Sequence, residues 1–152
     1  MRRAVAERTL EVDLIANSLL WRGREELLSS ALAAAAAAEG KHGAVSVLLG
    51  DDASIARLNA QFRGKPGPTN VLAFPPAGGE EGFLGDIALS AETIAEEAQF
   101  QGKRFEDHAA HVIVHGFLHL LGYDHIDPRE AESMEARERA ILASIGVDDP
   151  YA

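Results

Sequence analysis

The sequence predicts one α/β (α+β) domain over residues 1–152, in which helices pack on a mixed sheet of about four strands. A chain of 152 residues with 47% hydrophobic composition is sized for a single core. Short apolar or alternating segments are interleaved with longer helical segments, and the chain contains no internal repeat or heptad array.

The first half of the chain is expected to form strand, helix, strand and helix. LEVDLIAN at 10–17 alternates apolar and polar residues as a half-buried strand does, and the Leu-, Glu-, Arg- and Ala-rich stretch after it predicts a helix. AVSVLLGD at 44–51 predicts the second strand. Asp51 is suited to cap the next helix, which continues to about Phe62 before a Gly- and Pro-rich break at 64–68.

The second half adds two strands and several helices. TNVLAF at 69–74 and FLGDIALS at 83–90 predict strands on either side of a loop at 75–82. Helices are expected at about 90–102 and 105–121. A last helix begins after Asp127 and Pro128, and its inner face is expected to carry Met134, Ile141, Leu142 and Ile145.

Charge and composition exclude several classes of protein. The net charge of −10 argues against broad, non-specific binding to nucleic acid. No window approaches the roughly 20 apolar residues of a membrane span, and charges interrupt the N-terminus where a signal peptide is apolar, so a cytoplasmic protein without membrane contact is expected. Since the chain has no cysteine, any metal must be bound by His, Asp or Glu.

Five of the six histidines lie between residues 108 and 125. His115 and His119 are four residues apart on a predicted helix, so both rings can reach one ion. Gly122 is suited to end the helix and turn His125 back to the same point. Three imidazoles leave one tetrahedral position open, as in catalytic zinc sites, so one Zn²⁺ per chain is expected, with nickel, copper or iron as alternatives.

The spacing H-x-x-x-H-x-x-G-x-x-H is the metzincin zinc pattern with one residue changed. A metzincin peptidase has its general base, a Glu, directly after the first His, where this chain has Gly116. The change argues against proteolysis but leaves the metal ligands intact. Packing or surface roles are favoured for His108 and His111, whereas Asp124 either assists at the metal or only bonds its own backbone.

Four segments resemble the YbeY endoribonucleases: HGFLHLLGYDH at 115–125, LNAQFRGKPGPTNVLAF at 58–74, LGDIALS at 84–90 and SMEARERAIL at 133–142. They span most of the chain in the order of that family. The resemblance implies a zinc-dependent, single-strand-specific endoribonuclease, a hydrolase that acts in ribosomal RNA maturation at the 3′ end of the small-subunit RNA and in ribosome quality control. It also implies that His115, His119 and His125 are zinc ligands and that Arg63 is needed for activity.

Arg63 lies in a segment, residues 53–79, that contains no Asp or Glu. A guanidinium offers two parallel donors to a phosphate and stays charged at any working pH. Together with the resemblance, this position makes Arg63 the expected catalytic residue. Lys65 adds positive charge, and Thr69 and Asn70 add neutral donors, so these residues and Arg63 are expected to bind RNA. The nucleophile stays open between a water molecule and the 2′-hydroxyl of the RNA.

Two other functions compete with RNA cleavage. One is a metal-stabilised ribosome assembly factor without catalysis, and the other is a metzincin-like zinc peptidase. For an endoribonuclease, the acidic total charge predicts dependence on a docking partner, such as a ribosomal protein or an assembly GTPase, because bulk RNA is repelled.

Overall fold

The computed structural model describes residues 9–78 and 81–152; the expectations for residues 1–8, and for 79–80 in the loop, lie outside this part of the chain. The elements are β1 (Leu10–Ala16), the short 3-10 helix η2 (Leu19–Trp21), α1 (Glu25–Ala38), β2 (Gly43–Gly50), α2 (Asp52–Arg63), β3 (Val71–Phe74), β4 (Phe83–Ser90), α3 (Ala91–Gln101), α4 (Phe105–Leu120) and α5 (Pro128–Ser144).

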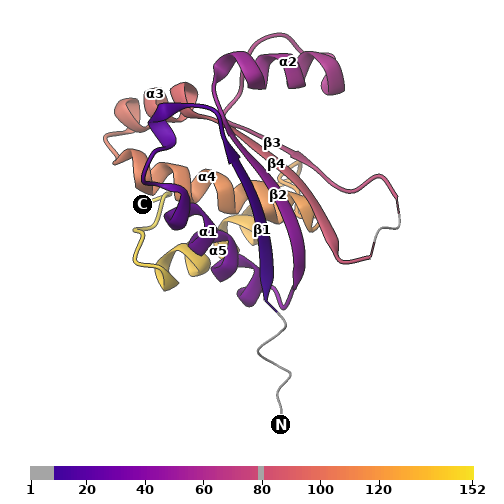
Figure 1. The fold of residues 1–152 in the computed structure, drawn as a ribbon. Coiled ribbons are helices and arrows are strands. Elements are labelled where there is room, and N and C mark those ends of the chain that lie inside the picture. The colour runs from indigo at the N-terminus through magenta and orange to yellow at the C-terminus, as the bar shows by residue number, and fades with distance from the viewer. Residues whose placement is uncertain (1–8, 79–80) are drawn as a thin grey trace.

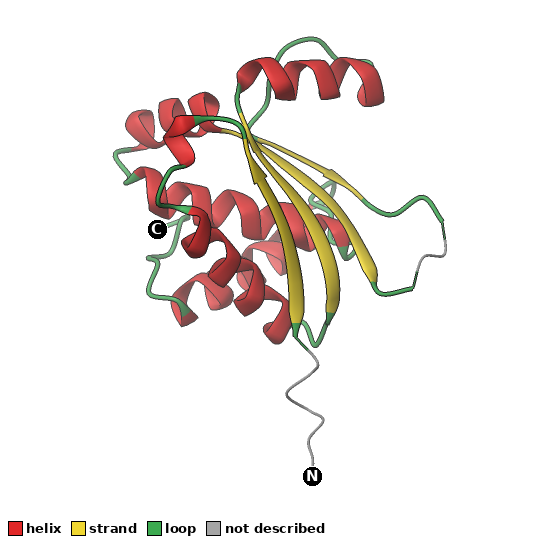
Figure 2. Ribbon diagram, in the orientation of Figure 1, coloured by secondary structure: helices red, strands yellow, loops and turns green. Residues whose placement is uncertain are grey.

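The four strands form one mixed sheet in the order β1-β2-β4-β3 (Figure 2). The β1, β2 and β4 strands run parallel to one another, and β3 pairs with β4 in the antiparallel direction. The antiparallel pair follows from the direct connection of β3 to β4 through a loop, since parallel strands need a longer crossover. The predicted α/β class and the mixed four-stranded sheet are therefore confirmed.

The two faces of the sheet are covered unequally (Figure 1). The helices α1, α3, α4 and α5 lie on one side, where Val47 on β2 and Ile87 on β4 join the main core. The α2 helix lies on the other side, over a smaller cluster formed by Ile55, Leu72 and Ala88. Side chains that alternate along each strand thus supply two cores of different size.

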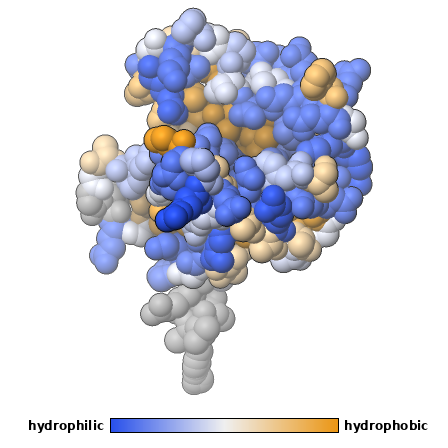
Figure 3. Space-filling view, turned by 180° about the vertical axis from the view of Figure 1, so that it is seen from behind, coloured by the Kyte–Doolittle hydropathy of each residue, from blue (hydrophilic) through white to orange (hydrophobic). Residues whose placement is uncertain are grey.

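The α2 helix covers only one end of its face of the sheet (Figure 1). Beside it, a groove of about 690 Å³ is lined by apolar residues such as Leu58, Phe62 and Phe74. Seen from behind the view of Figure 1, the surface is mostly hydrophilic, apart from a recessed hydrophobic area in its upper half (Figure 3). Among the residues that the structure describes, no helix has the length and apolar character needed to span a membrane.

The segment between β1 and β2 differs from the single helix that its composition suggests. It first forms η2, and α1 begins only at Glu25. The reason is tertiary: Trp21 is fully buried and its indole N–H donates to the carbonyl oxygen of Gly50 at 2.9 Å. Docking of this one large side chain fixes a turn that local helix propensity does not favour.

The inner face of α5 carries the expected apolar residues and one unexpected carboxylate. Met134, Ile141 and Leu142 are buried, as predicted, and Ile145 packs partly buried against the core. Glu138 lies on the same face and is fully buried. Burial of an unpaired carboxylate costs much free energy, so hydrogen-bond partners are expected around Glu138.

Candidate metal centre

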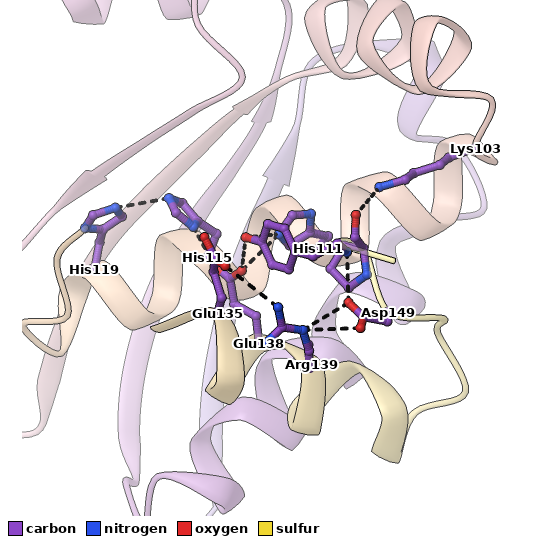
Figure 4. A network of polar contacts seen from close by, with 10 residues as sticks. Lys103, His111, His115, His119, Glu135, Glu138, Arg139 and Asp149 are labelled. Atoms are coloured by element: carbon purple, nitrogen blue, oxygen red, sulfur yellow. Dashed lines mark hydrogen bonds and ion pairs between the residues drawn. The ribbon is translucent and has the colours of Figure 1, made fainter. Parts of the chain in front are cut away.

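His115, His119 and His125 come together at one end of α4. Each offers a ring nitrogen, and these three atoms lie within 4.8 Å of one another. The Nε2 atoms of His115 and His119 are 3.1 Å apart, and a dashed line joins the two rings in Figure 4. Two nitrogens bound to one tetrahedral zinc at 2.0–2.1 Å would be about 3.3 Å apart, so the spacing fits a shared ion.

The third histidine is placed by the turn after α4. Gly122 has φ +102, a left-handed conformation that lets the chain reverse, as the sequence predicts. The Tyr123 N–H donates to the carbonyl oxygen of Leu118 at 3.1 Å, and the Tyr123 hydroxyl donates to Glu39 at 2.8 Å. These contacts fix the turn from both sides and bring His125 over the helix end.

The donor chemistry of the cluster suits a transition metal. All three donors are imidazole nitrogens, which zinc, copper, iron and nickel accept and calcium and magnesium disfavour. Burial, followed by the nearby His115 and His125 rings, lowers the pKa of His119, so its ring is held neutral with a lone pair available. The cluster can therefore bind a metal ion.

Gly116, which stands where a metzincin has its general base, is packed against the sheet. A Cβ atom added to Gly116 would lie 2.9 Å from Cγ2 of Val71 and 3.4 Å from Cγ2 of Ile87. The close packing of α4 on β3 and β4 thus leaves no room for a glutamate. Both the sequence and the packing therefore argue against a metzincin peptidase, because the position of its general base is occupied by a tightly packed glycine.

The acid-free segment lies across from the histidines. One cleft of about 720 Å³ is lined by the three histidines together with Arg63, Lys65, Thr69 and Asn70. Within residues 9–78 and 81–152, neither Arg63 nor Lys65 takes part in an ion pair. The structure therefore brings every residue predicted for the site to a single cleft, with both cations available to a ligand.

Asn59 and Glu97, which the sequence analysis did not single out, fix the two ends of this loop. Gly64 ends α2 with φ 65, and the Asn59 side-chain amide donates to the carbonyl oxygen of Gly67 at 3.0 Å, which closes the loop after Arg63. On the other side, the Asn70 amide donates to Glu97 at 3.0 Å. Asn59 lies inside the segment that resembles the YbeY family, whereas no local pattern marks Glu97.

The remaining polar residues near the cluster have mainly structural contacts. His108 is 5% exposed and its Nε2 lies 2.8 Å from Glu97, whereas His111 contacts Glu138 and Tyr151. The Asp124 carboxylate accepts a hydrogen bond from the backbone N–H of His125 at 2.7 Å and also lines the cleft. The packing role expected for His108 and His111 agrees with these contacts.

The fold and the cleft define a class: an α/β domain with a three-histidine cluster that can bind a metal ion and that shares a cleft with a basic loop. Residues 15–146 match the family model described as Endoribonuclease YbeY. The chain belongs to this family.

The relatives agree with this assignment. An Endoribonuclease YbeY of Parvibaculum lavamentivorans is 45% identical over 157 residues, covering 93% of this chain and 85% of that protein. One of Maricaulis maris is 47% identical, covering 92% and 91%, and one of Paracoccus denitrificans is 55% identical, covering 66% and 65%. The solution structure of TM1509 from Thermotoga maritima has a TM-score of 0.57 at 26% identity, covering 88% of this chain and 91% of that one.

Proposed function

We propose that the chain is a single-domain, zinc-dependent, single-strand-specific endoribonuclease that acts in maturation of the small-subunit ribosomal RNA 3′ end and in ribosome quality control. The observation that carries the proposal is the shared cleft: the three histidines and Arg63 line the same cavity. A metal centre opposite a free guanidinium suits a phosphodiester substrate. Membership in the Endoribonuclease YbeY family supports the same reaction.

The ligands of the zinc ion are His115, His119 and His125 in this proposal. When bound there, zinc supplies Lewis-acid chemistry toward a phosphoryl oxygen and a water molecule. Arg63 donates to the non-bridging oxygens of the scissile phosphate and stabilises the charge that develops there. Lys65 adds a point charge.

Thr69 and Asn70 contribute neutral hydrogen bonds to the bound strand. The Asn70 side chain is well suited because its amide is already fixed by Glu97 at 3.0 Å, so less conformational entropy is lost on binding. The nucleophile remains open between water and the RNA 2′-hydroxyl. The end groups separate them, since attack by the 2′-hydroxyl alone leaves a cyclic or 3′ phosphate.

Access to RNA is expected to depend on a partner. The net charge of −10 repels a polyanion at long range, while the cations of the cleft act only nearby. A ribosomal protein or an assembly GTPase that holds the enzyme on the ribosomal particle would remove this barrier. The cytoplasmic location, where ribosomes are assembled, is part of the same proposal.

The test is incubation of the purified protein with ribosomal RNA and a short single-stranded RNA, with bound metal quantified in every sample. We expect cleavage by the wild type, none after chelation or in His119→Ala, and a decrease of about 100-fold in Arg63→Ala with zinc retained. Matched controls are Arg57→Ala, on the same helix, and His42→Ala, outside the cluster. Both should cut normally.

A ribosome assembly factor without catalysis gives a different pattern. The wild type would hold zinc and leave every RNA intact, while Arg63→Ala would still weaken binding to the small ribosomal subunit. That result would overturn the nuclease proposal and keep the metal site.

A further inference from the structure

We propose that Glu138, on α5, is a positioning residue that prepares His115 to bind the metal, and that the C-terminal Tyr151 completes this arrangement. The inference rests on the proposed metal site but concerns residues outside the cleft. Neither Glu138 nor Tyr151 lines the cleft, and Glu138 reaches the site only through His115.

The first step is the contact between the carboxylate and the ring. Oε2 of Glu138 lies 2.6 Å from Nδ1 of His115. An ionised carboxylate only accepts, so Nδ1 of His115 must carry the proton. The other ring nitrogen, Nε2, is then a bare lone pair, and it is the atom that faces Nε2 of His119 at 3.1 Å.

The second step concerns the other neutral tautomer of His115, which this contact excludes. A free neutral imidazole can carry its proton on either nitrogen, and the tautomer with the proton on Nε2 cannot bind a metal through that atom. The contact with Glu138 both selects the binding tautomer and fixes the ring plane. Hydrogen bonds of this kind to a metal-ligating histidine also make the ligand more basic.

The third step concerns the other oxygen of the carboxylate. Oε1 of Glu138 accepts from Nε2 of His111 at 3.1 Å and from the Tyr151 hydroxyl. Three donors therefore converge on two oxygens of a fully buried group. This shell compensates the loss of hydration that would otherwise make a carboxylate untenable there.

The last segment of the chain holds Tyr151 in place. The Tyr151 N–H donates to Asp149 at 2.8 Å, and Asp149 in turn pairs with Arg139 at 3.2 Å. Lys103 donates to the carbonyl oxygen of Pro150 at 2.9 Å, and the Arg139 guanidinium lies 5.3 Å from the centre of the Tyr151 ring. Figure 4 shows these contacts leading from α4 and α5 to the histidine pair.

The arrangement predicts that Glu138→Gln weakens zinc binding. A glutamine has one acceptor oxygen and one NH2 group, so it cannot accept from all three donors, and either His115 or the His111–Tyr151 pair must exchange donor and acceptor roles. If the NH2 group faces His115, the ring must move its proton to Nε2, which blocks the metal-binding atom. We therefore expect Glu138→Gln to weaken zinc binding about 10- to 100-fold.

The test measures zinc affinity by competition with a chromophoric chelator, together with the tautomer of His115 in the zinc-free protein by nitrogen-15 NMR. The variants are Glu138→Gln and Tyr151→Phe, and the matched control is Glu132→Gln, the same change on an exposed position of the same helix. We expect weaker binding and a mixed tautomer in Glu138→Gln, a smaller loss in Tyr151→Phe, and wild-type behaviour in the control.

The outcomes separate the inference from the metal site on which it rests. A wild type that binds no zinc would overturn the proposed site itself. A wild type and a folded Glu138→Gln variant of equal zinc affinity would keep the site and overturn the positioning role. If Glu138→Gln does not fold in a thermal melt, Tyr151→Phe decides: weaker zinc binding supports the inference, and unchanged affinity overturns it.

Discussion

Val71 on β3 and Gly116 on α4 are in such close contact that a Cβ atom on Gly116 would lie 2.9 Å from Cγ2 of Val71. The packing of α4 on the sheet thus favours a glycine at this position. His115 and His119 lie on that helix, and residues of both the helix and β3 line the cleft.

The first prediction concerns this contact. Gly116→Ala gains up to about 1 kcal/mol of helix propensity, but the overpacking costs about 1–3 kcal/mol, so the free energy of unfolding should decrease by about 1 kcal/mol. Val71→Ala makes room for the methyl group. In that background Gly116→Ala should be neutral or stabilising, which urea unfolding of the four zinc-free proteins measures. If Gly116→Ala alone proved as stable as the wild type, the packing argument would be contradicted.

The second prediction concerns the loop that presents Arg63. Asn59→Ala removes the hydrogen bond to the carbonyl oxygen of Gly67, which leaves the loop less fixed at a cost of about 1 kcal/mol. We expect a higher KM for RNA with nearly unchanged zinc content, since the three histidines lie on α4 and in the turn after it. Steady-state kinetics check this, with Gln61→Ala, an exposed neighbour on α2, as control. Equal KM values in both variants would show that Asn59 does not position the loop.

The third prediction concerns zinc and stability. Since the site exists only in the folded chain, zinc at 100 times its Kd should raise the free energy of unfolding by about 2.7 kcal/mol. Chelation should remove this increase in the wild type and in His42→Ala. Addition of zinc should not stabilise His119→Ala, as followed by thermal unfolding. A zinc-dependent shift of wild-type size in His119→Ala would place the ion elsewhere.

The fourth prediction concerns acid. Burial alone would raise the pKa of Glu138, but hydrogen bonds from His111, His115 and Tyr151 outweigh it and lower the pKa from 4.5 to about 2. A carboxylate with a depressed folded-state pKa stabilises the protein fully above its ordinary value. That stabilisation is then lost as the pH falls from about 4.5 toward 2.

Urea unfolding of the zinc-free protein across this range measures the effect. The wild type should lose stability steeply, and Glu138→Gln, which is uncharged throughout, should show a shallower slope. Identical slopes would mean that Glu138 is not ionised in the folded protein. Protonation of His119 acts separately: its pKa is lowered by burial, so its effect begins as the pH falls below 6.5.

Much of this architecture follows from local patterns in the sequence. The segments 10–17, 44–51 and 83–90 form strands as predicted, because alternation of apolar side chains and flanking turn residues are properties of short stretches. The clustering of His115, His119 and His125 could be predicted for the same reason. His115 and His119 are one helical turn apart, and Gly122 reverses the chain within three residues of His125.

The contacts between distant segments were decided only by the tertiary structure. Trp21 breaks the expected helix because it docks on Gly50, and the buried carboxylate of Glu138 is satisfied by a hydrogen bond from Nδ1 of His115 on another helix. No local pattern separates Glu138 from the exposed acidic residues of α5, since its environment depends on α4 and on the C-terminal turn. The sequence by itself determined the elements and the histidine cluster, which depend on neighbours along the chain. Strand order, the shared cleft and the buried carboxylate depend on packing between segments far apart in the chain.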